Sequence, residues 1–227
     1  MKMKYKDYIK RLSRKNWLFY KMSTHAFNIY GKMSALGGVK VTKSKCVKLN
    51  KNIIGKNNVF RTGIDCLIDN LNLRIQGNNN TITIGNNCSI GKNCDFWIIG
   101  NNCSITIGDD TRISSYCAIE VQEDNQYITI GKDNLWSHHV RLRNNDSHYI
   151  YDAASGTRTN LPKPIEIDNH VWIAAHATIL KGVHVGSGSV IGTHALVTKS
   201  TPDNTVVAGI PAKVVQENIV WSDRPRV

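Results

Sequence analysis

Three absences in this sequence of 227 residues narrow the class of protein. No apolar run approaches the ~18 residues that a membrane-spanning helix needs. The basic N-terminus has no continuous apolar stretch of the kind found in a secretory signal. The six cysteines include no C-x-x-C pair, which argues against a cysteine zinc site. We therefore expect a protein of the reducing cytoplasm that holds no metal.

Acidic residues are almost missing from the first 45 residues, which hold 12 Lys and Arg and a single acid, Asp7. The whole chain has 29 Lys and Arg against 17 Asp and Glu, a formal net charge of +12. Such a charge would ordinarily suggest nucleic acid as a partner. Residues 46–227, however, hold 17 basic and 16 acidic residues and are nearly neutral. The charge belongs to an N-terminal appendage, and we expect no nucleic-acid binding.

The body of the chain has a six-residue period. Aliphatic residues keep this interval over the run Ile167, Ile173, Ile179, Val185, Ile191 and Val197, and shorter sets precede it. An amphipathic helix would repeat near 3.6 residues and an ordinary strand at 2. A hexapeptide suits a short strand followed by a turn, and three such units make a triangular coil that stacks by parallel pairing. The sequence predicts an all-β parallel β-helix over residues 41–202.

The scarcity of proline and the placement of the cysteines agree with this fold. Proline is absent before Pro162, as a parallel ladder requires, because every strand residue must supply a backbone N–H. Four cysteines occupy the small fifth position of their units, which points into the coil; they are Cys88, Cys94, Cys103 and Cys117. We expect them to be buried thiols that fill the core.

The period stops between Leu142 and Ile167. We predict a loop over residues 144–165 that leaves the solenoid, and insertions in repeat proteins usually carry function. The regular repeats end near Thr201, so residues 203–227 are predicted to form a cap followed by a short tail helix.

Several segments, read together, resemble the hexapeptide-repeat acyltransferases: NNDSHYI, IDNHVWIAAHATILKGVHVG and VTKSTPDNTVVAGIPAKVV. Within that family the chain is similar to O-acetyltransferases that use acetyl-CoA to modify sugars, and the ending PAKVVQENIVW is similar to that of capsular polysialic acid O-acetyltransferases. The resemblance implies a left-handed coil, a homotrimer and active sites between subunits. It also implies acetyl-CoA as donor and, as acceptor, a sugar hydroxyl of a bacterial surface polysaccharide or its precursor.

The resemblance places the catalytic histidine at His148, at the family's spacing before Trp172. A hydroxyl that attacks a thioester must lose its proton, and imidazole is a base of suitable pKa. We expect direct transfer in a ternary complex, with no covalent acyl-enzyme. Asp146 or Asn145 is a candidate to orient the imidazole, although a turn-forming role for these residues fits equally well.

Trp172 is similar to the family tryptophan that lines the cleft near the thioester. Its indole should point outward, because Val171 and Ile173 take the inward positions. One coil before the loop, Trp136 and His138 are candidates for binding the acceptor sugar.

The family's CoA-contacting positions fall on Ala175, Thr193, Thr198, Lys199 and Lys213. The two lysines would supply charge to the phosphates of the cofactor.

Other functions stay open at this point. His176 and His194 lie one predicted coil apart and should stack on the same face, but two histidines make a weak metal site. N-acetylation of a nucleotide-linked amino sugar is an alternative, as is a non-catalytic or metal-binding β-helix protein.

The N-terminal appendage, residues 1–40, is predicted to be helical, because apolar residues recur among its lysines and arginines with partial helical periodicity. One hypothesis places residues 1–35 on the inner face of the cytoplasmic membrane or on an anionic polysaccharide. The other has the segment cap the open first coil.

Overall fold

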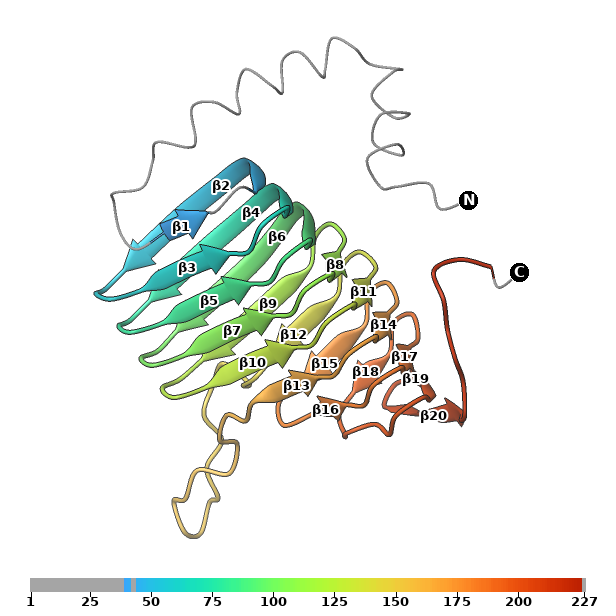
Figure 1. Cartoon of the computed structure of the whole chain (residues 1–227). Helices are drawn as coiled ribbons and strands as arrows, with labels where there is room; N and C mark the ends of the chain where they lie inside the picture. The colour runs from blue at the N-terminus through green and yellow to red at the C-terminus, as the bar shows by residue number, and fades with distance from the viewer. Residues whose placement is uncertain (1–38, 42–43, 226–227) are drawn as a thin grey trace. The chain divides into compact units, whose positions relative to one another are not determined.

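The computed structural model describes residues 39–41 and 44–225, which contain strands and no helix. The strands form a parallel β-helix with three sides, as Figure 1 shows, and the all-β prediction is confirmed. The helical segment predicted for the N-terminus, with its membrane and capping hypotheses, lies outside the described residues apart from strand β1. Within the described chain, no helix is long and apolar enough to cross a membrane.

The first side of the solenoid is a seven-stranded parallel sheet. Its strands, in spatial order, are β1 (Val39–Val41), β3 (Val59–Thr62), β5 (Thr81–Ile84), β7 (Ser104–Ile107), β10 (Tyr127–Ile130), β13 (Ile165–Ile167) and β16 (His184–Val185).

The second and third sides share three long strands in the first coils. These are β2 (Lys45–Ile54), β4 (Leu67–Gln76) and β6 (Ser89–Ile99), and β6 pairs with strands of both sides. The second side continues through β8 (Arg112–Ile113), β11 (Leu135–Trp136), β14 (Trp172–Ile173), β17 (Val190–Ile191) and β19 (Val206–Gly209). The third side continues through β9 (Ala118–Gln122), β12 (Arg141–Arg143), β15 (Thr178–Leu180) and β18 (Leu196–Val197).

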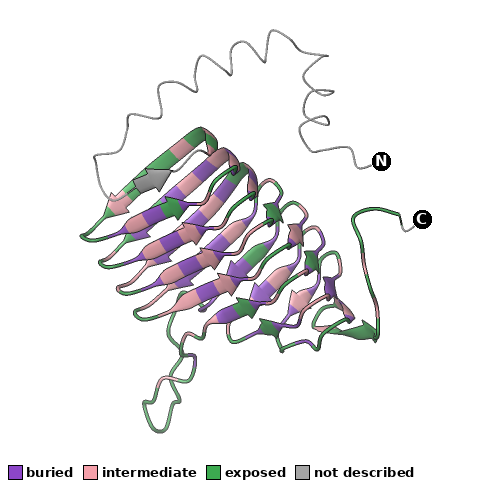
Figure 2. Cartoon of the chain, viewed as in Figure 1, coloured by how far each residue is buried: buried purple, intermediate pink, exposed green. Residues whose placement is uncertain are grey.

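Side chains alternate between the core and the surface along strands such as β5, β7 and β10, as Figure 2 shows for the sheets. The aliphatic residues of the six-residue repeat form the core, and those at Ile84, Ile107 and Ile173 are almost completely buried. Each coil covers the open end of its neighbour, which is how a solenoid builds a continuous core from short repeats.

Coil length differs between the two ends of the solenoid. Before the loop, equivalent corner asparagines such as Asn57, Asn79 and Asn102 are separated by 22 or 23 residues, which is the length of one coil. After the loop, Ile167 pairs with Val185, so a coil is three hexapeptides long. The predicted coil of three hexapeptides therefore holds only after the loop. The earlier coils are longer because strands such as β6, with 11 residues, extend the third side beyond one hexapeptide.

The cysteines are buried free thiols, as predicted for Cys88, Cys94, Cys103 and Cys117, and Cys66 joins them. They also do more than fill space. Each of the five thiols donates a hydrogen bond to a corner carbonyl of the next coil, for example Cys94 Sγ to Ser114 O at 3.1 Å. Thr111 and Ser189 make the same bond from the same position. The small inward residue thus satisfies a backbone acceptor that turns away from the ladder.

The end of the chain differs from the prediction. β19 is followed by an antiparallel strand, β20 (Ala212–Gln216), and residues 217–225 contain no helix. The tail helix predicted from the sequence is therefore wrong. The segment instead pairs as strand β20 and then lies along the solenoid, where Ile219 N donates to Asn204 O at 2.9 Å.

Candidate active site

The predicted loop leaves the solenoid after β12 on the third side and returns at β13 on the first side, as Figure 1 shows. Its base is held by Arg158, whose guanidinium makes two hydrogen bonds of 2.6 Å to the carboxylate of Glu123. Arg158 keeps the pKa of Glu123 below its ordinary value, and the bidentate geometry makes this a strong contact. Arg158 also lies over the ring of Tyr149, 4.5 Å from its centroid. The loop is therefore anchored to the preceding coil.

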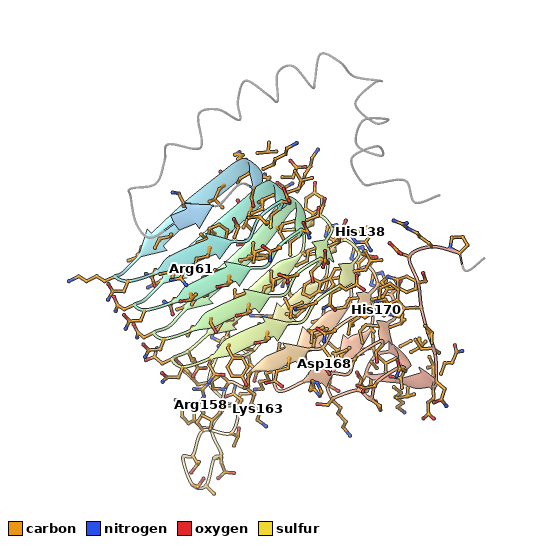
Figure 3. The ribbon with its side chains drawn as sticks, in the orientation of Figure 1. Arg61, His138, Arg158, Lys163, Asp168 and His170 are labelled. Carbon is orange, nitrogen blue, oxygen red and sulfur yellow. The ribbon has the colours of Figure 1, made fainter. Side chains whose placement is uncertain are left out.

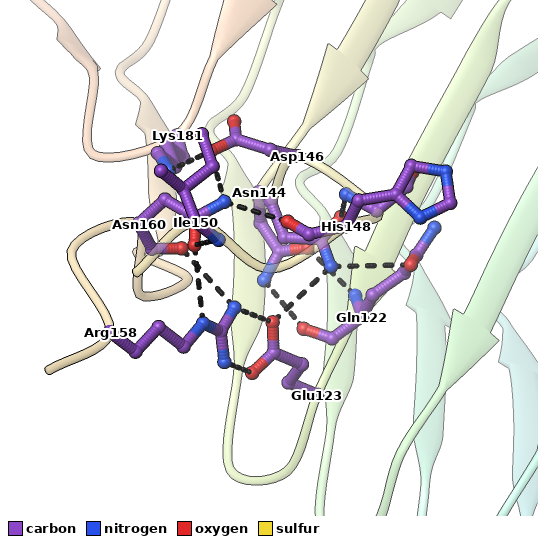
Figure 4. Close-up of polar contacts among 11 residues, drawn as sticks. Gln122, Glu123, Asn144, Asp146, His148, Ile150, Arg158, Asn160 and Lys181 are labelled. Atoms are coloured by element: carbon purple, nitrogen blue, oxygen red, sulfur yellow. Dashed lines mark hydrogen bonds and ion pairs between the residues drawn. The ribbon is translucent and has the colours of Figure 1, made fainter. Parts of the chain in front are cut away.

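Asn160 organises the segment that carries His148, as Figure 4 shows. Its side chain is 7% exposed and donates to His148 O at 2.7 Å and to Asp146 Oδ2 at 3.0 Å. The same amide accepts a hydrogen bond from Ile150 N at 2.8 Å. Sequence reasoning missed Asn160, because it lies in a segment without periodicity and its partners are 10 to 14 residues away.

The carboxylate of Asp146 is engaged by Lys181 and Asn160, and it makes no hydrogen bond to the imidazole of His148 among the described residues. The bond from Lys181 holds the pKa of Asp146 below its ordinary value. The predicted role as orienting partner of the imidazole is therefore corrected. Asp146 instead fixes the backbone ahead of His148, because its carboxylate is held by the ammonium group of Lys181, directly after β15, and by the amide of Asn160.

The imidazole of His148 points away from this anchoring network, as Figure 4 shows. His148 is exposed, while its peptide N–H donates to Asp146 O at 2.8 Å. Its neighbours Ser147 and Tyr149 line a groove of about 710 Å³ at the base of the loop. The backbone of His148 is thus fixed, while its ring is exposed and turned away from the anchoring contacts.

Trp172 points outward, as predicted, with 38% of its surface exposed, while Val171 and Ile173 are fully buried. It lies on β14 of the second side. His148 projects from the corner between the third and first sides, which is the corner opposite the second side in a three-sided coil. One chain therefore places the two residues on opposite sides of the solenoid.

The acceptor-binding prediction for Trp136 is wrong. Its indole is 1% exposed and fills the core, because residue 136 falls at the inward position of its repeat and pairs with Ile173. His138 is exposed, two positions later at the next corner. Figure 3 shows His138 away from Arg158 and the loop.

His138 belongs to a column of aromatic rings at the corner between the second and third sides. Tyr116, His139, His176 and His194 stack on successive coils with centroids 4.6 to 5.0 Å apart. The stacking of His176 on His194 was predicted. Loss of water contact, followed by repulsion from the neighbouring imidazoles, lowers the pKa of His176.

Three of these residues, His138, His139 and His176, hold nitrogens within 4.8 Å of one another, which is compatible with a metal ion. The rings of His139 and His176 lie within 24° of parallel. Their in-plane lone pairs therefore do not converge, and a shared metal would require a ring to rotate.

The positions predicted for CoA lie at the surface of the short coils. Ala175 and Thr193 directly precede His176 and His194 on successive coils, at the corner between the second and third sides. Thr198 and Lys199 follow β18. Lys213 lies on β20, which also contacts β18. All but the half-buried Ala175 are exposed.

The hexapeptide repeats of this solenoid identify the class of protein to which it belongs. The family model described as bacterial transferase hexapeptide (six repeats) matches residues 164–199. The chain is 37% identical over 208 residues to a polysialic acid O-acetyltransferase of Neisseria meningitidis, covering 88% of this chain and 91% of the relative.

Two solved structures cover most of the chain. The polysialic acid O-acetyltransferase OatWY aligns with 85% of this chain and 93% of its own, at 31% identity and a TM-score of 0.52. The polysialic-acid-specific acetyltransferase NeuO aligns with 84% and 89%, at 29% identity and a TM-score of 0.52. The chain belongs to the hexapeptide-repeat acetyltransferases, in the family that contains these O-acetyltransferases, and it is an enzyme of acetyl transfer.

Proposed function

We propose that this enzyme transfers acetyl from acetyl-CoA to a sugar hydroxyl of a bacterial surface polysaccharide or its precursor. The similarity over nearly the whole chain to polysialic acid O-acetyltransferases supports this class of acceptor. The observation that carries the mechanism is His148, whose backbone is anchored by Asn160 while its imidazole is exposed and points away from the anchoring network.

His148 acts as the general base. It takes the proton of the acceptor hydroxyl as the oxygen attacks the thioester carbonyl, a transfer that typically contributes about 10²–10⁴ in rate. The CoA thiolate then leaves, and the acetyl group stays on the sugar oxygen. The mechanism needs no acyl-enzyme, because every thiol of the described chain except the half-buried Cys46 is sealed in the core.

A second copy of the chain completes the site. His148 and Trp172 lie on opposite sides of one solenoid, so the indole that lines the cleft must come from a neighbour. A closed homotrimer satisfies this requirement with three equivalent sites, each between two subunits. His138, at a different corner from the loop, is proposed to contact the acceptor in that assembly.

The donor lies along the short coils in this proposal. Ala175 and Thr193 are small enough to let an extended pantetheine arm approach the backbone, and Thr198 lies on the next corner. Lys199 and Lys213 are exposed cations available to the phosphates of CoA. The six free cysteines agree with a reducing compartment, and we place the enzyme in the cytoplasm, where acetyl-CoA is made.

The proposal is tested by offering the purified enzyme acetyl-CoA with a panel of glycans that includes polysialic acid, neutral capsular polymers and nucleotide-linked amino sugars. Release of free CoA with O-acetyl signals in the product NMR spectrum supports it. N-acetyl signals from an amino sugar would instead support the alternative function. The proposal would be overturned if no acceptor in the panel caused the release of CoA.

A further inference from the structure

The C-terminal tail is strapped along the corner between the first and second sides. It leaves β20, and Ile219 N bonds to Asn204 O on the last coil at 2.9 Å. Further along, Asp223 pairs with Arg112 on β8 at 2.9 Å. The tail therefore runs back across several coils, from the end of the solenoid toward its middle, as the red trace in Figure 1 shows.

Trp221 is the best-held side chain of this tail. Its ring stacks on His170 with centroids 4.1 Å apart and planes 8° from parallel. Its Nε1 donates to His170 O at 2.8 Å, and His170 Nε2 lies 3.3 Å from Trp221 O. Asp133 fixes the other ring nitrogen of His170 at 2.7 Å. These contacts occupy one face of the Trp221 ring and its N–H group, and so they fix the orientation of the indole.

The held ring lies beside the exposed indole of Trp172. The two centroids are 6.1 Å apart at an interplanar angle of 47°, within the range of interacting aromatic pairs. Trp172 otherwise lies on the outer face of β14, paired with Leu135 on β11 and Val190 on β17. Its flanking residues in the chain are turned into the core, so Trp221 supplies a wall that the strand itself does not provide.

We propose that Trp221 is a positioning residue of the active site, which together with His170 holds Trp172 in the orientation used in acetyl transfer. This inference rests on the proposed function, in which Trp172 lines the acetyl-transfer cleft. It assigns the C-terminal tail to the active site rather than to the end cap of the solenoid. Trp221 itself need not touch the substrate, because its effect passes through the neighbouring indole.

The test is a double-mutant cycle on the full-length enzyme. Trp221→Ala should lower kcat/KM about tenfold, with the larger part of the change in kcat. Trp221→Phe, which keeps a ring against His170, should recover most of this loss. The double variant Trp172→Ala/Trp221→Ala should be no slower than Trp172→Ala alone, because Trp221 acts through Trp172. Losses that multiply in the double variant would overturn the proposal, as would full activity of Trp221→Ala.

The matched control is Arg112→Ala, which releases Asp223 further along the tail and leaves the contacts of Trp221 in place. Its rate should equal that of the wild type. A rate as low as that of Trp221→Ala would show that any loosening of the tail suffices and would refute a specific role for the indole.

A readout without catalysis separates this proposal from the proposed function. With 5-fluorotryptophan at the five tryptophans, the ¹⁹F resonance of Trp172 is assigned by its absence from Trp172→Phe. Trp221→Ala should shift and broaden that resonance, and Arg112→Ala should not. An unchanged Trp172 signal in Trp221→Ala would refute positioning even if the wild type transferred no acetyl group. A shifted signal in an enzyme inactive on all acceptors would refute only the proposed function.

Discussion

The coils before the loop and the coils after it are built differently. Before the loop a turn takes 22 or 23 residues, and side-chain amides run from coil to coil along two corners, for example Asn79 Nδ2 to Asn102 Oδ1 at 3.2 Å. After the loop a turn takes three hexapeptides, and the small inward positions are mostly apolar, as at Ala177, Val183 and Ala195.

The two kinds of coil have different proposed roles, one in stability and the other in acetyl transfer. The residues proposed for acetyl transfer, apart from His138, lie on the short coils, on the loop that opens them, or on the strand that follows them. The long coils hold ladders of cysteine and asparagine that satisfy backbone groups inside the corners. We infer that the long coils contribute stability, while the short coils expose side chains that leave the core unchanged. The predictions below test that division.

The largest effect is expected at the junction of the two regions. His148→Ala should reduce the rate of acetyl transfer at least about a hundredfold, because the attacking hydroxyl loses its base. The melting temperature and oligomeric state should not change, because the imidazole contacts no described residue through a hydrogen bond. Steady-state release of CoA and thermal unfolding measure the two quantities.

His184→Ala is the control for that variant. His184 is an exposed histidine of the first side, paired with Asp168 at 3.0 Å and not part of the proposed site. Its loss should leave turnover unchanged. Wild-type turnover in His148→Ala would remove the base from the mechanism.

A buried amide of the long coils should matter for stability alone. Asn80 is fully buried, donates to Gly100 O at 2.8 Å and accepts from Cys103 N at 2.8 Å. Asn80→Ala leaves both backbone groups without a partner and should lower the free energy of unfolding by about 1–3 kcal/mol. Urea denaturation measures it, and kcat of the folded enzyme should stay the same.

Asn50→Ala provides the comparison, since Asn50 bonds to Asn72 at 2.8 Å on the exposed surface of the same region. Water replaces that partner, so the change should stay within about 0.5 kcal/mol. Equal losses in the two variants would contradict the assignment of stability to the buried ladder.

A smaller effect on rate is expected at the base of the loop. Asn160→Ala removes the amide that fixes His148 O and Asp146, and kcat should fall about tenfold because the base is no longer held near its attack position. Ser155→Ala at the tip, where the hydroxyl bonds only within the loop, should have wild-type kcat. A KM effect without a change in kcat would assign Asn160 to binding instead.

The fold was largely predictable because its signal is local. A six-residue period places Ile84, Ile107 and Ile173 in the core whatever the neighbouring coils contain. Coil length was predicted only after the loop. In the long coils the extra residues alternate like the rest of the strand, so the sequence pattern does not mark them. The pairing of Ile105 with Ile128 in the structure shows the true length of the coil. The tail helix failed for a related reason, since short apolar runs suit a strand or a strap as well as a helix.

The site was predictable only in part, because its contacts are distant in sequence. The outward position of Trp172 follows from its neighbours, and the stacking of His176 on His194 follows from the coil. The partner of Asp146 is Lys181, 35 residues away, and that of Trp221 is His170, 51 residues away. No local pattern marks either pair, so the loop anchors and the strapped indole emerge only in three dimensions.

The smallest effect concerns the corner between the second and third sides, where His176 and His194 of the short coils continue a column that begins with Asn93 in a long coil. The pKa of His176 is lowered by loss of water contact and by repulsion from its neighbours. The folded chain therefore binds a proton at this site less readily than the unfolded chain, whose value lies near 6.5. The contribution of His176 to the free energy of unfolding is therefore fully present above pH 6.5 and is lost as the pH falls below that value.

His176→Asn should remove this dependence, because asparagine accepts the left-handed backbone that Asn93 adopts at the same corner of a long coil. Melting temperatures of the variant and the wild type are measured from about pH 8 to about pH 5. Below pH 6.5 the melting temperature of the wild type should fall more steeply than that of the variant. Parallel curves would show that the stacked imidazoles do not resist protonation. Histidine and asparagine at position 176 would then be equivalent in their effect on the pH dependence of stability.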